Sequence, residues 1–357
     1  MSLSKPVPLG QLFEVSIPMD YSDPTSPFFE EKNRNRASVF PKRFVAFYVP
    51  NILRGRKNVN LLIAFHGSTE NGPIFRARTT GYAYDQLACE YGFVVAYPSG
   101  YKGNWNDSRK AVTYPAKLEQ IDDVGFTKAI IEYSAKRWST FINRTFIIGY
   151  SNGGHLCYRL AFELGSSYIA GVAIHCANLP TDDNSDCTPL ACDPIPICIV
   201  NGTADPVNPW RGGEVSFSPT SSSGNLVGSR GAHRSALDTS KYFAMRFFGA
   251  GYYLELEEIK DLDQIQDVLQ FRNRSDGRIL VKLIGMIGEG HYVPIAAGEK
   301  KALIIGPRRG AVHAPREVLR FFEESTTYFD DAKELISNHP IGEVTSQFLC
   351  AHFPAPS

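Results

Sequence analysis

A serine stands between glycines where the sequence pattern changes from strand to helix. The segment GYSNGG (149–154) follows the strand-like run TFIIGY and precedes the helical pattern HLCYRLAFEL. A nucleophilic serine at the tip of a sharp strand-to-helix turn needs glycine neighbours, because Cβ atoms would collide there. Free N–H groups at the start of the following helix favour the negative charge that develops during acyl transfer. The pattern therefore predicts that Ser151 is a nucleophile.

A serine hydroxyl is a weak nucleophile, so this chemistry requires a histidine as general base. The apolar run ILVKLIGMI leads into GEGH (288–291), which places His291 on a glycine-flanked loop after a strand. In parallel sheets, ligand-binding and catalytic sites form at the carboxyl ends of the strands. Of the eight histidines, His155 and His175 fit core or helix packing better, and His313, the main rival, has no strand before it. We expect His291 to be the base.

The histidine needs an acidic partner that orients it and stabilises the imidazolium. Enzymes built on such a turn carry this acid between the serine and the histidine in the chain. The strand-like run IPICIV is followed by NGTADP (201–206), and the proline biases Asp205 toward an extended backbone. Asp205 is therefore the predicted acid. Asp182 and Asp183, after the preceding strand, are the alternatives; otherwise they are polar loop residues.

Acyl transfer also needs two backbone donors that hold the developing oxyanion. The N–H of Asn152, the residue after the nucleophile, is one predicted donor. The second should come from the loop HGST (66–69), which follows the apolar run LLIAF. A His-Gly pair would also suit an ordinary tight turn, but its place after a strand favours Ser68 as a donor.

Three aromatic residues and an asparagine occupy loops at the same predicted edge of the sheet. Tyr101, Asn104 and Trp105 follow the strand-like run at 93–98, and Trp210 follows the predicted acid. Such aromatics can simply anchor a loop, or they can form a shallow cleft beside the serine. We predict the cleft, without the hydrophobic lid of lipases, because no long apolar helical insertion is present. The expected substrate contacts are His66, Asn104, Trp105, Trp210 and Tyr292.

Alternating strand and helix patterns must position these residues. Strands are predicted at 43–50, 60–66, 93–98, 144–150, 169–175, 195–200, 252–259 and 279–287, and helices at about 79–91, 122–138, 152–165, 232–249 and 315–325. Continuously apolar strands that alternate with helices indicate an α/β fold with a mostly parallel central sheet and helices on both faces. We expect one domain over 1–357, with a core at about 40–325 and both ends, including the tail 326–357, as appendages. The longest expected loop, 207–231, is rich in Gly, Ser and Asn.

Composition excludes several classes of function. Lys+Arg and Asp+Glu are 37 each, so the net charge is zero and nucleic-acid binding is not expected as a main role. Apolar stretches are too short for a transmembrane helix, and no metal-binding or nucleotide-binding motif appears, so we expect no membrane span, metal or other cofactor. Only Cys187 and Cys192 of the seven cysteines are placed for a disulfide. The N-terminal sequence has no signal-peptide core, which leaves secretion after removal of a leader and a cytoplasmic location both open.

Together the motifs resemble the polyhydroxybutyrate depolymerase and feruloyl esterase group of α/β hydrolases. The resemblance spans roughly residues 40–325 and rests on AFHGS (64–68), GFVVAYPSG (92–100), DDVGF (122–126), GYSNGG, NGTADPVNPWRGG (201–213) and GEGHYVP (288–294). It implies an α/β-hydrolase fold and a triad of Ser151, Asp205 and His291. The chain departs from the group at Asn201, where a histidine is common, and at Tyr292, where a tryptophan is common. Members of the group are also mostly exported.

The expected function is hydrolysis of carboxylic esters through an acyl-enzyme. Short-chain, aryl (feruloyl-like), acetyl-sugar and hydroxyalkanoate esters are the expected substrates, small or polymeric. A serine peptidase or amidase on the same fold is one alternative, although the chain has no propeller or large cap domain. A non-catalytic binding protein of this fold is another, and the complete set of triad residue types argues against it. The oligomeric state is left open.

Overall fold

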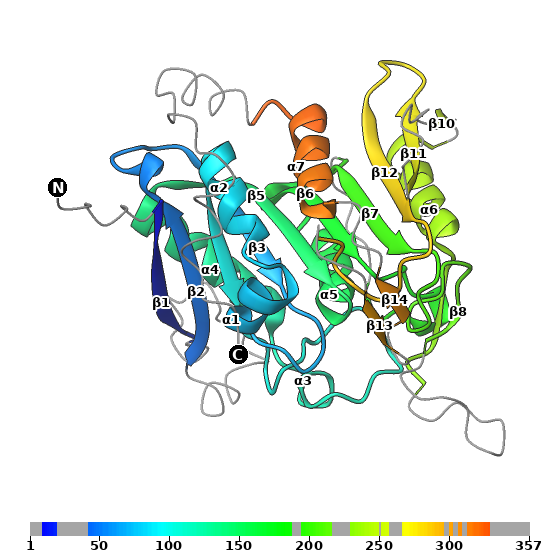
Figure 1. The fold of residues 1–357 in the computed structure, drawn as a ribbon, viewed down its shortest axis with the longest axis horizontal. Helices are drawn as coiled ribbons and strands as arrows, with labels where there is room; N and C mark the ends of the chain where they lie inside the picture. Colours follow the sequence, from blue (N-terminus) through cyan, green and yellow to red (C-terminus); the bar gives the residue numbers. More distant parts are fainter. Residues whose placement is uncertain are drawn as a thin grey trace.

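A single large sheet forms the centre of the computed structural model, which describes residues 9–19, 42–187, 194–215, 229–249, 251–256, 266–295, 300–302, 306–308 and 313–328. Its strand order is β1-β2-β4-β3-β5-β6-β7-β12-β11-β10 (Figure 1). The strands are β1 (Gly10–Pro18), β2 (Lys42–Pro50), β3 (Val59–Phe65), β4 (Phe93–Pro98), β5 (Thr140–Tyr150), β6 (Ile169–His175), β7 (Ile197–Gly202), β10 (Tyr252–Leu256), β11 (Gln266–Asn273) and β12 (Ile279–Met286). Two short pairs lie outside it: β8 (Gly213–Glu214) with β9 (Ala232–His233), and β13 (Lys300–Ala302) with β14 (Gly306–Arg308).

The middle of the sheet is parallel and its two edges are antiparallel. β4, β3, β5, β6, β7 and β12 run in the same direction, whereas β2 and β1 on one side and β11 and β10 on the other run against their neighbours. Every residue of β3, β4, β6 and β7 is buried. Strands covered on both faces must be apolar throughout, which explains the continuous apolar runs.

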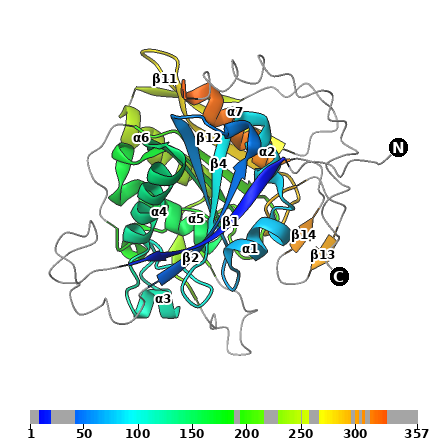
Figure 2. The same ribbon diagram turned by 90° about the vertical axis from the view of Figure 1, so that its left-hand side faces the viewer.

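Helices cover both faces of the sheet (Figure 2). α4 (Asp123–Trp138), α5 (Asn152–Glu163) and α6 (Ala236–Phe248) pack on one face, and α2 (Ala83–Tyr91) and α7 (Ala314–Ser325) on the other. Alternate side chains of β3 point to opposite faces: Leu61 and Ile63 join the core under α4 and α5, and Leu62 joins the core under α2 and α7. The short elements are α1 (Gly72–Ile74), α3 (Pro115–Leu118), the π-helical turn Phe75–Thr79 and the 3₁₀ turns Asn51–Leu53, Gly165–Ser167 and Asp182–Asn184.

Capping side chains fix where two of the long helices begin. The Asp122 side chain accepts a hydrogen bond from the N–H of Gly125 at 2.7 Å and so caps α4. Ser235 caps α6 in the same way, through the N–H of Asp238. The next residue in α4, Asp123, forms a buried ion pair with Arg43 of β2 at 2.8 Å. The two adjacent aspartates at the start of this helix therefore cap it and tie it to the sheet.

The predicted mostly parallel sheet with helices on both faces is confirmed. Two strands of the central sheet were not predicted: β1, an edge strand with only Ile17 buried, and β11, whose apolar residues are interrupted by polar ones. The short pairs β8–β9 and β13–β14 were not predicted either. α6 begins later than expected because residues 232–233 pair with β8 as β9. Residues 257–259 of one predicted strand, 216–228 of the predicted loop and 329–357 of the tail lie outside the described residues. The single-domain organisation stays a prediction.

Within the described ranges, no helix combines the length and the hydropathy needed to cross a bilayer.

The contact between α7 and the sheet gives a test of the core. Phe322 is fully buried, and its ring centroid lies 4.7 Å from that of Phe146 on β5. Phe322→Ala should lower the free energy of unfolding by about 3–5 kcal/mol, because it removes a large apolar group and leaves a cavity. Urea denaturation measures this loss. Leu118→Ala, at a site 67% exposed, is the control and should change stability by less than about 0.5 kcal/mol; equal losses would contradict the packing described here.

Candidate active site

Ser151 occupies the turn between β5 and α5. Its backbone has φ 54° and ψ −115°, in the left-handed half of conformational space that residues with a Cβ rarely adopt. The turn is held by the N–H of Ser151, which donates to His175 O of β6 at 2.9 Å. A strained backbone of this kind persists only where its surroundings enforce it, and it clusters at functional sites.

Two glycines make the turn possible. A Cβ on Gly149 would lie 2.2 Å from the carbonyl oxygen of Gly153, and a Cβ on Gly153 would lie 2.4 Å from that of Phe65 in β3. Both contacts are with backbone atoms, which cannot move aside cheaply. The glycine spacing in the sequence therefore follows from close packing of β5, α5 and β3, and this packing presents Ser151 at the carboxyl edge of the sheet.

The structure brings Ser151, His291 and Asp205 into one hydrogen-bonded chain. The Ser151 Oγ lies 2.9 Å from His291 Nε2, and His291 Nδ1 lies 2.7 Å from Asp205 Oδ2. Asp205 Oδ1 accepts from the backbone N–H groups of Val207 and Asn208 at 2.8 and 2.9 Å. With the carboxylate as acceptor, the ring proton belongs on Nδ1. Nε2 then accepts the proton of the serine hydroxyl.

Neighbouring strands hold the histidine loop by its backbone. The hydroxyl of Tyr150 donates to His291 O at 2.8 Å, and the thiol of Cys176 donates to Tyr292 O at 3.0 Å. The N–H of Ala204 donates to Glu289 O at 2.9 Å, which joins the loop carrying the acid to the loop carrying the histidine. Sequence reasoning missed Tyr150 and Cys176. Tyr150 lies within the GYSNGG motif, whereas nothing in the sequence around Cys176 indicates its contact.

One group of described side chains has atoms that could ligate a metal ion. It consists of Cys176, Asp205 and His291, whose ligand atoms lie within 4.8 Å of one another. Asp205 and His291 are hydrogen-bonded to each other, and burial raises the pKa of the Cys176 thiol well above its ordinary value. A protonated thiol that already donates to a carbonyl is a poor ligand, so we assign Cys176 to holding the loop.

The alternative triad residues lie elsewhere. Asp182 is 90% exposed and pairs with Arg234 at 2.7 Å, and Asp183 is also exposed. The ring of His313 accepts from the N–H of Arg316 and caps α7. None of the three contacts Ser151 or His291.

The two predicted oxyanion donors belong to separate segments, both of which pass close to Ser151. Asn152 is the first residue of α5, where N–H groups have no partner within the helix. Ser68 lies on the loop after β3, and a Cβ built on the adjacent Gly67 would be 3.6 Å from the Cβ of Ser151. That loop is held by the N–H of Thr69, which donates to Gly103 O at 2.8 Å.

Two of the predicted substrate contacts are wrong. His66 and Trp105 are completely buried. The His66 ring bonds to Gly67 O at 2.7 Å through Nδ1 and to the N–H of Gly100 at 2.8 Å through Nε2. The Trp105 indole donates to His66 O at 2.9 Å, and its ring packs edge-on against Phe65. Both side chains tie loops together and leave no surface for a ligand.

The other predicted contacts differ in how far they are exposed. Asn104 is buried and donates to Lys102 O at 3.2 Å. Trp210 is half-buried with its six-membered ring against Gly285 of β12, since a Cβ there would lie 2.8 Å from that ring. Tyr292, half-buried directly after His291, has the Arg308 guanidinium 5.7 Å from its ring centroid. Substrate contact by Asn104, Trp210 or Tyr292 stays a prediction.

Of the two cysteines that the sequence places for a disulfide, the structure describes one. Cys187 is a free thiol, and Cys192 lies outside the described residues.

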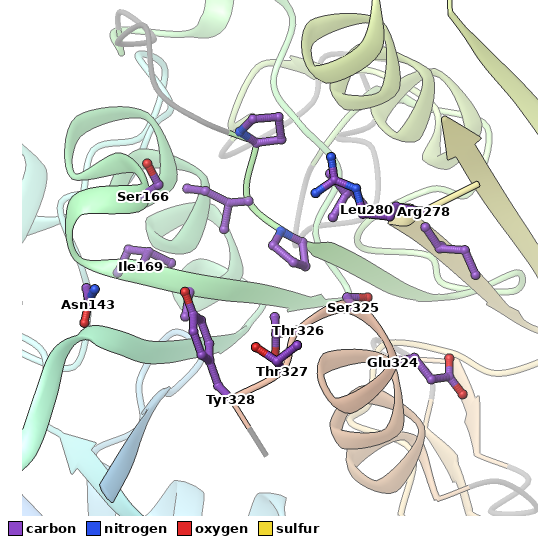
Figure 3. Close-up of a pocket in the computed structure, with 15 residues that line it drawn as sticks. Asn143, Ser166, Ile169, Arg278, Leu280, Glu324, Ser325, Thr326, Thr327 and Tyr328 are labelled. Carbon is purple, nitrogen blue, oxygen red and sulfur yellow. The ribbon is translucent and has the colours of Figure 1, made fainter. Parts of the chain in front are cut away.

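A separate pocket opens at the opposite edge of the sheet (Figure 3). It has a volume of about 640 Å³ and lies where β6 and β12 begin, between Ile169, Leu280 and Tyr328. Ser151 lies beyond the other end of these parallel strands. Open α/β sheets bind their ligands at the carboxyl ends of the strands, so this pocket is not part of the triad site.

Comparison with known proteins places the fold. No protein-family model matches the chain. It is 29% identical over 121 residues to NocK of Nocardia uniformis subsp. tsuyamanensis, which is assigned as an esterase; the match covers 34% of this chain and 33% of NocK. The chain thus spans about a third of the length of the curated relative that it matches.

Solved structures extend the likeness to most of the chain. The acetyl xylan esterase from Aspergillus awamori matches with a TM-score of 0.50 and 16% identity, over 88% of this chain and 99% of that one. An S-formylglutathione hydrolase from Agrobacterium tumefaciens matches at 0.38 and 14% identity, over 57% and 79%, too distantly to add to the assignment. The architecture and this overlap show that the chain has the α/β-hydrolase fold.

The neutral state of His66 predicts a pH dependence of stability. Burial lowers the pKa of His66 from 6.5 to about 4. Between these values the unfolded chain binds a proton that the folded chain does not, so the free energy of unfolding falls as the pH falls. Each such histidine contributes at most about 1.4 kcal/mol per pH unit.

Urea denaturation of the wild type and of His66→Gln between about pH 5 and pH 6.5 isolates this contribution. The variant will be less stable throughout, because it loses ring hydrogen bonds. Its stability should also depend less steeply on pH than that of the wild type. Equal slopes for the two proteins would show that His66 does not stay neutral in the fold.

Proposed function

We propose that this protein is a serine hydrolase of carboxylic esters that works through an acyl-enzyme. The observation that carries the proposal is the chain of hydrogen bonds from Ser151 through His291 to Asp205, at 2.9 and 2.7 Å. These three residues lie at the carboxyl ends of the parallel strands of an α/β-hydrolase sheet, where the strained turn presents the serine. A nucleophile, its base and the group that orients the base are thus assembled in one place.

Acylation begins when Ser151 Oγ attacks the ester carbonyl carbon. The hydroxyl proton passes to His291 Nε2 as the Oγ–carbon bond forms, and the resulting imidazolium is stabilised by Asp205. Collapse of the tetrahedral intermediate breaks the bond to the alcohol oxygen, which takes the proton from Nε2 as it leaves. Water then attacks the acyl-enzyme with His291 again as base. The carboxylic acid departs and Ser151 regains its proton.

The oxyanion of each tetrahedral intermediate would be bound by backbone N–H groups. We assign these to Asn152 at the start of α5 and Ser68 on the loop after β3. Donors on two rigid segments need no reorganisation as charge develops on the oxygen, and loss of one such donor typically lowers kcat by about 10²–10³-fold.

Short-chain esters are the proposed substrates. The likeness to NocK, assigned as an esterase, and to an acetyl xylan esterase supports ester hydrolysis with a small acyl group. The motifs shared with polyhydroxybutyrate depolymerases and feruloyl esterases extend the candidates to hydroxyalkanoate and aryl esters. The same triad could cleave amides, but no contact in the described residues favours a peptide. A non-catalytic binding protein would not need the hydrogen bonds that join Ser151, His291 and Asp205.

An active-site phosphonate probe gives the most direct comparison of triad variants. The wild type should be labelled stoichiometrically at Ser151, and Ser151→Ala should not be labelled.

Asp205→Asn should lower kcat by about 10⁴-fold, because the amide favours the wrong tautomer of His291. Asp182→Asn, at an exposed aspartate of the neighbouring loop, is the matched control and should keep wild-type turnover.

Two results would contradict the assignment. If pure Ser151→Ala protein keeps most of the esterase activity, Ser151 is not the nucleophile. A larger loss in Asp182→Asn than in Asp205→Asn would move the acid to the preceding loop.

Activity on a series of soluble esters tests the proposed substrate class. We expect kcat/KM to fall as the acyl chain lengthens from acetyl, with no rise in rate above the solubility limit of a long-chain ester, since the sequence pattern predicts no lipase-type lid. Acetyl-sugar, feruloyl and hydroxybutyrate esters, with a matched anilide, identify the preferred group. Faster cleavage of the anilide than of its ester, or interfacial activation on a triglyceride, would contradict the proposal.

A further inference from the structure

The residue after the nucleophile is held by its side chain as well as by its helix. The Asn152 Oδ1 accepts from the N–H of Trp105 at 2.9 Å, and Asn152 Nδ2 donates to Asp107 Oδ2 at 2.6 Å. Both partners belong to the loop after β4. Because a side chain and its own backbone N–H share one Cα, these two bonds limit how far the N–H of Asn152 can move relative to Ser151.

The same loop also holds the other predicted oxyanion segment. The indole of Trp105 donates to His66 O at 2.9 Å, at the start of the loop that carries Ser68. His66 is in turn bonded to the N–H of Gly100 at 2.8 Å. Trp105 therefore bonds to the Asn152 side chain through both its backbone N–H and its C=O, and to His66 through its own side chain. It thus connects the two segments that lie beside Ser151.

A buried ion pair fixes the loop itself. Asp107 and Arg109 are almost completely inaccessible to solvent, and the guanidinium of Arg109 contacts both carboxylate oxygens, with Nε 3.1 Å from Oδ1 and 3.2 Å from Oδ2. The ammonium of Lys117 donates to Asp107 O at 2.8 Å. Burial alone would raise the pKa of Asp107, but Arg109 and its hydrogen bonds outweigh burial and hold that pKa below its ordinary value. The carboxylate is an anion that accepts from Asn152 at neutral pH.

We infer that Trp105 and Asp107 are positioning residues that set the distance between the two oxyanion donors. Trp105 acts through His66 and Asn152, and Asp107 acts through Asn152 alone. This inference rests on the proposed esterase function. Neither side chain reaches the substrate. Their effect is on the transition state, because oxyanion donors act only if they are held where the charged oxygen will be. A displacement of about 1 Å at such a group can lower the rate by about 10²-fold.

Three replacements remove these bonds in different combinations. Trp105→Phe removes the indole donor to His66 O, and Asp107→Asn removes the negative charge that binds Asn152. Asn152→Ala removes the side-chain hydrogen bonds to the loop after β4 but keeps the backbone N–H. Each should lower kcat by about 10- to 100-fold and leave KM within about twofold, since only the transition state is affected. Thermal unfolding identifies any variant that does not fold, and Asn152→Ala then carries the test.

A trifluoromethyl ketone and the matching secondary alcohol provide a readout that loss of stability would not mimic. The ketone forms a hemiketal oxyanion on Ser151, whereas the alcohol binds without forming one. The inhibition constant of the ketone should rise in each variant by about the factor lost from kcat/KM, and that of the alcohol should not change.

Controls come from similar residues outside this loop. Trp138→Phe alters a tryptophan packed against Phe47, and Asp85→Asn breaks a buried ion pair with Arg76 at 2.6 Å. Both should keep wild-type kcat. An active wild type with unchanged kcat and ketone binding in the three variants would overturn the inference. A wild type that neither hydrolyses esters nor binds the ketone would instead overturn the proposed function.

Discussion

The hydrogen bond between Asp205 and His291 Nδ1 fixes which nitrogen of the imidazole faces Ser151. At 2.7 Å, with the second carboxylate oxygen bound by two backbone N–H groups, it leaves the aspartate one orientation and the ring one tautomer. The hydrogen bond from the Tyr150 hydroxyl to His291 O holds the backbone of the histidine in place. The sheet brings these groups together because all of them lie at the carboxyl ends of its parallel strands.

A second constraint is that the site is built from polar groups that are almost all buried. Such groups must be paired, because a buried polar atom without a partner destabilises the fold. His66 meets this requirement as a neutral ring bonded on both sides, and Asp107 meets it as an anion beside Arg109. The buried polar residues around Ser151 therefore stabilise loop positions first and contribute to chemistry through those positions.

Local context pointed to Ser151, His291 and Asp205, which the structure places in one hydrogen-bonded chain, because each follows an apolar strand and has glycine or proline within two residues. Helix and sheet layers were predictable from the same apolar patterns. Trp105 was assigned to the substrate because its position on a loop does not show which way its side chain points. Asp107 was missed because its partner Asn152 lies 45 residues away in the chain. β1 was missed because an edge strand with one buried residue has no continuous apolar run.

Transfer of an acyl group to Ser151 is the step on which the proposed mechanism depends. Rapid quenching of the protein with p-nitrophenyl acetate, followed by mass spectrometry of its peptides, tests it most directly. We predict a transient acetyl group on the peptide that contains Ser151, with a burst of nitrophenol equal to the enzyme concentration if deacylation is the slower step. His291→Ala should give neither at a comparable rate. Ester hydrolysis with no acylated Ser151 at any quench time, or acetylation and deacetylation of a different residue, would show that Ser151 is not the nucleophile.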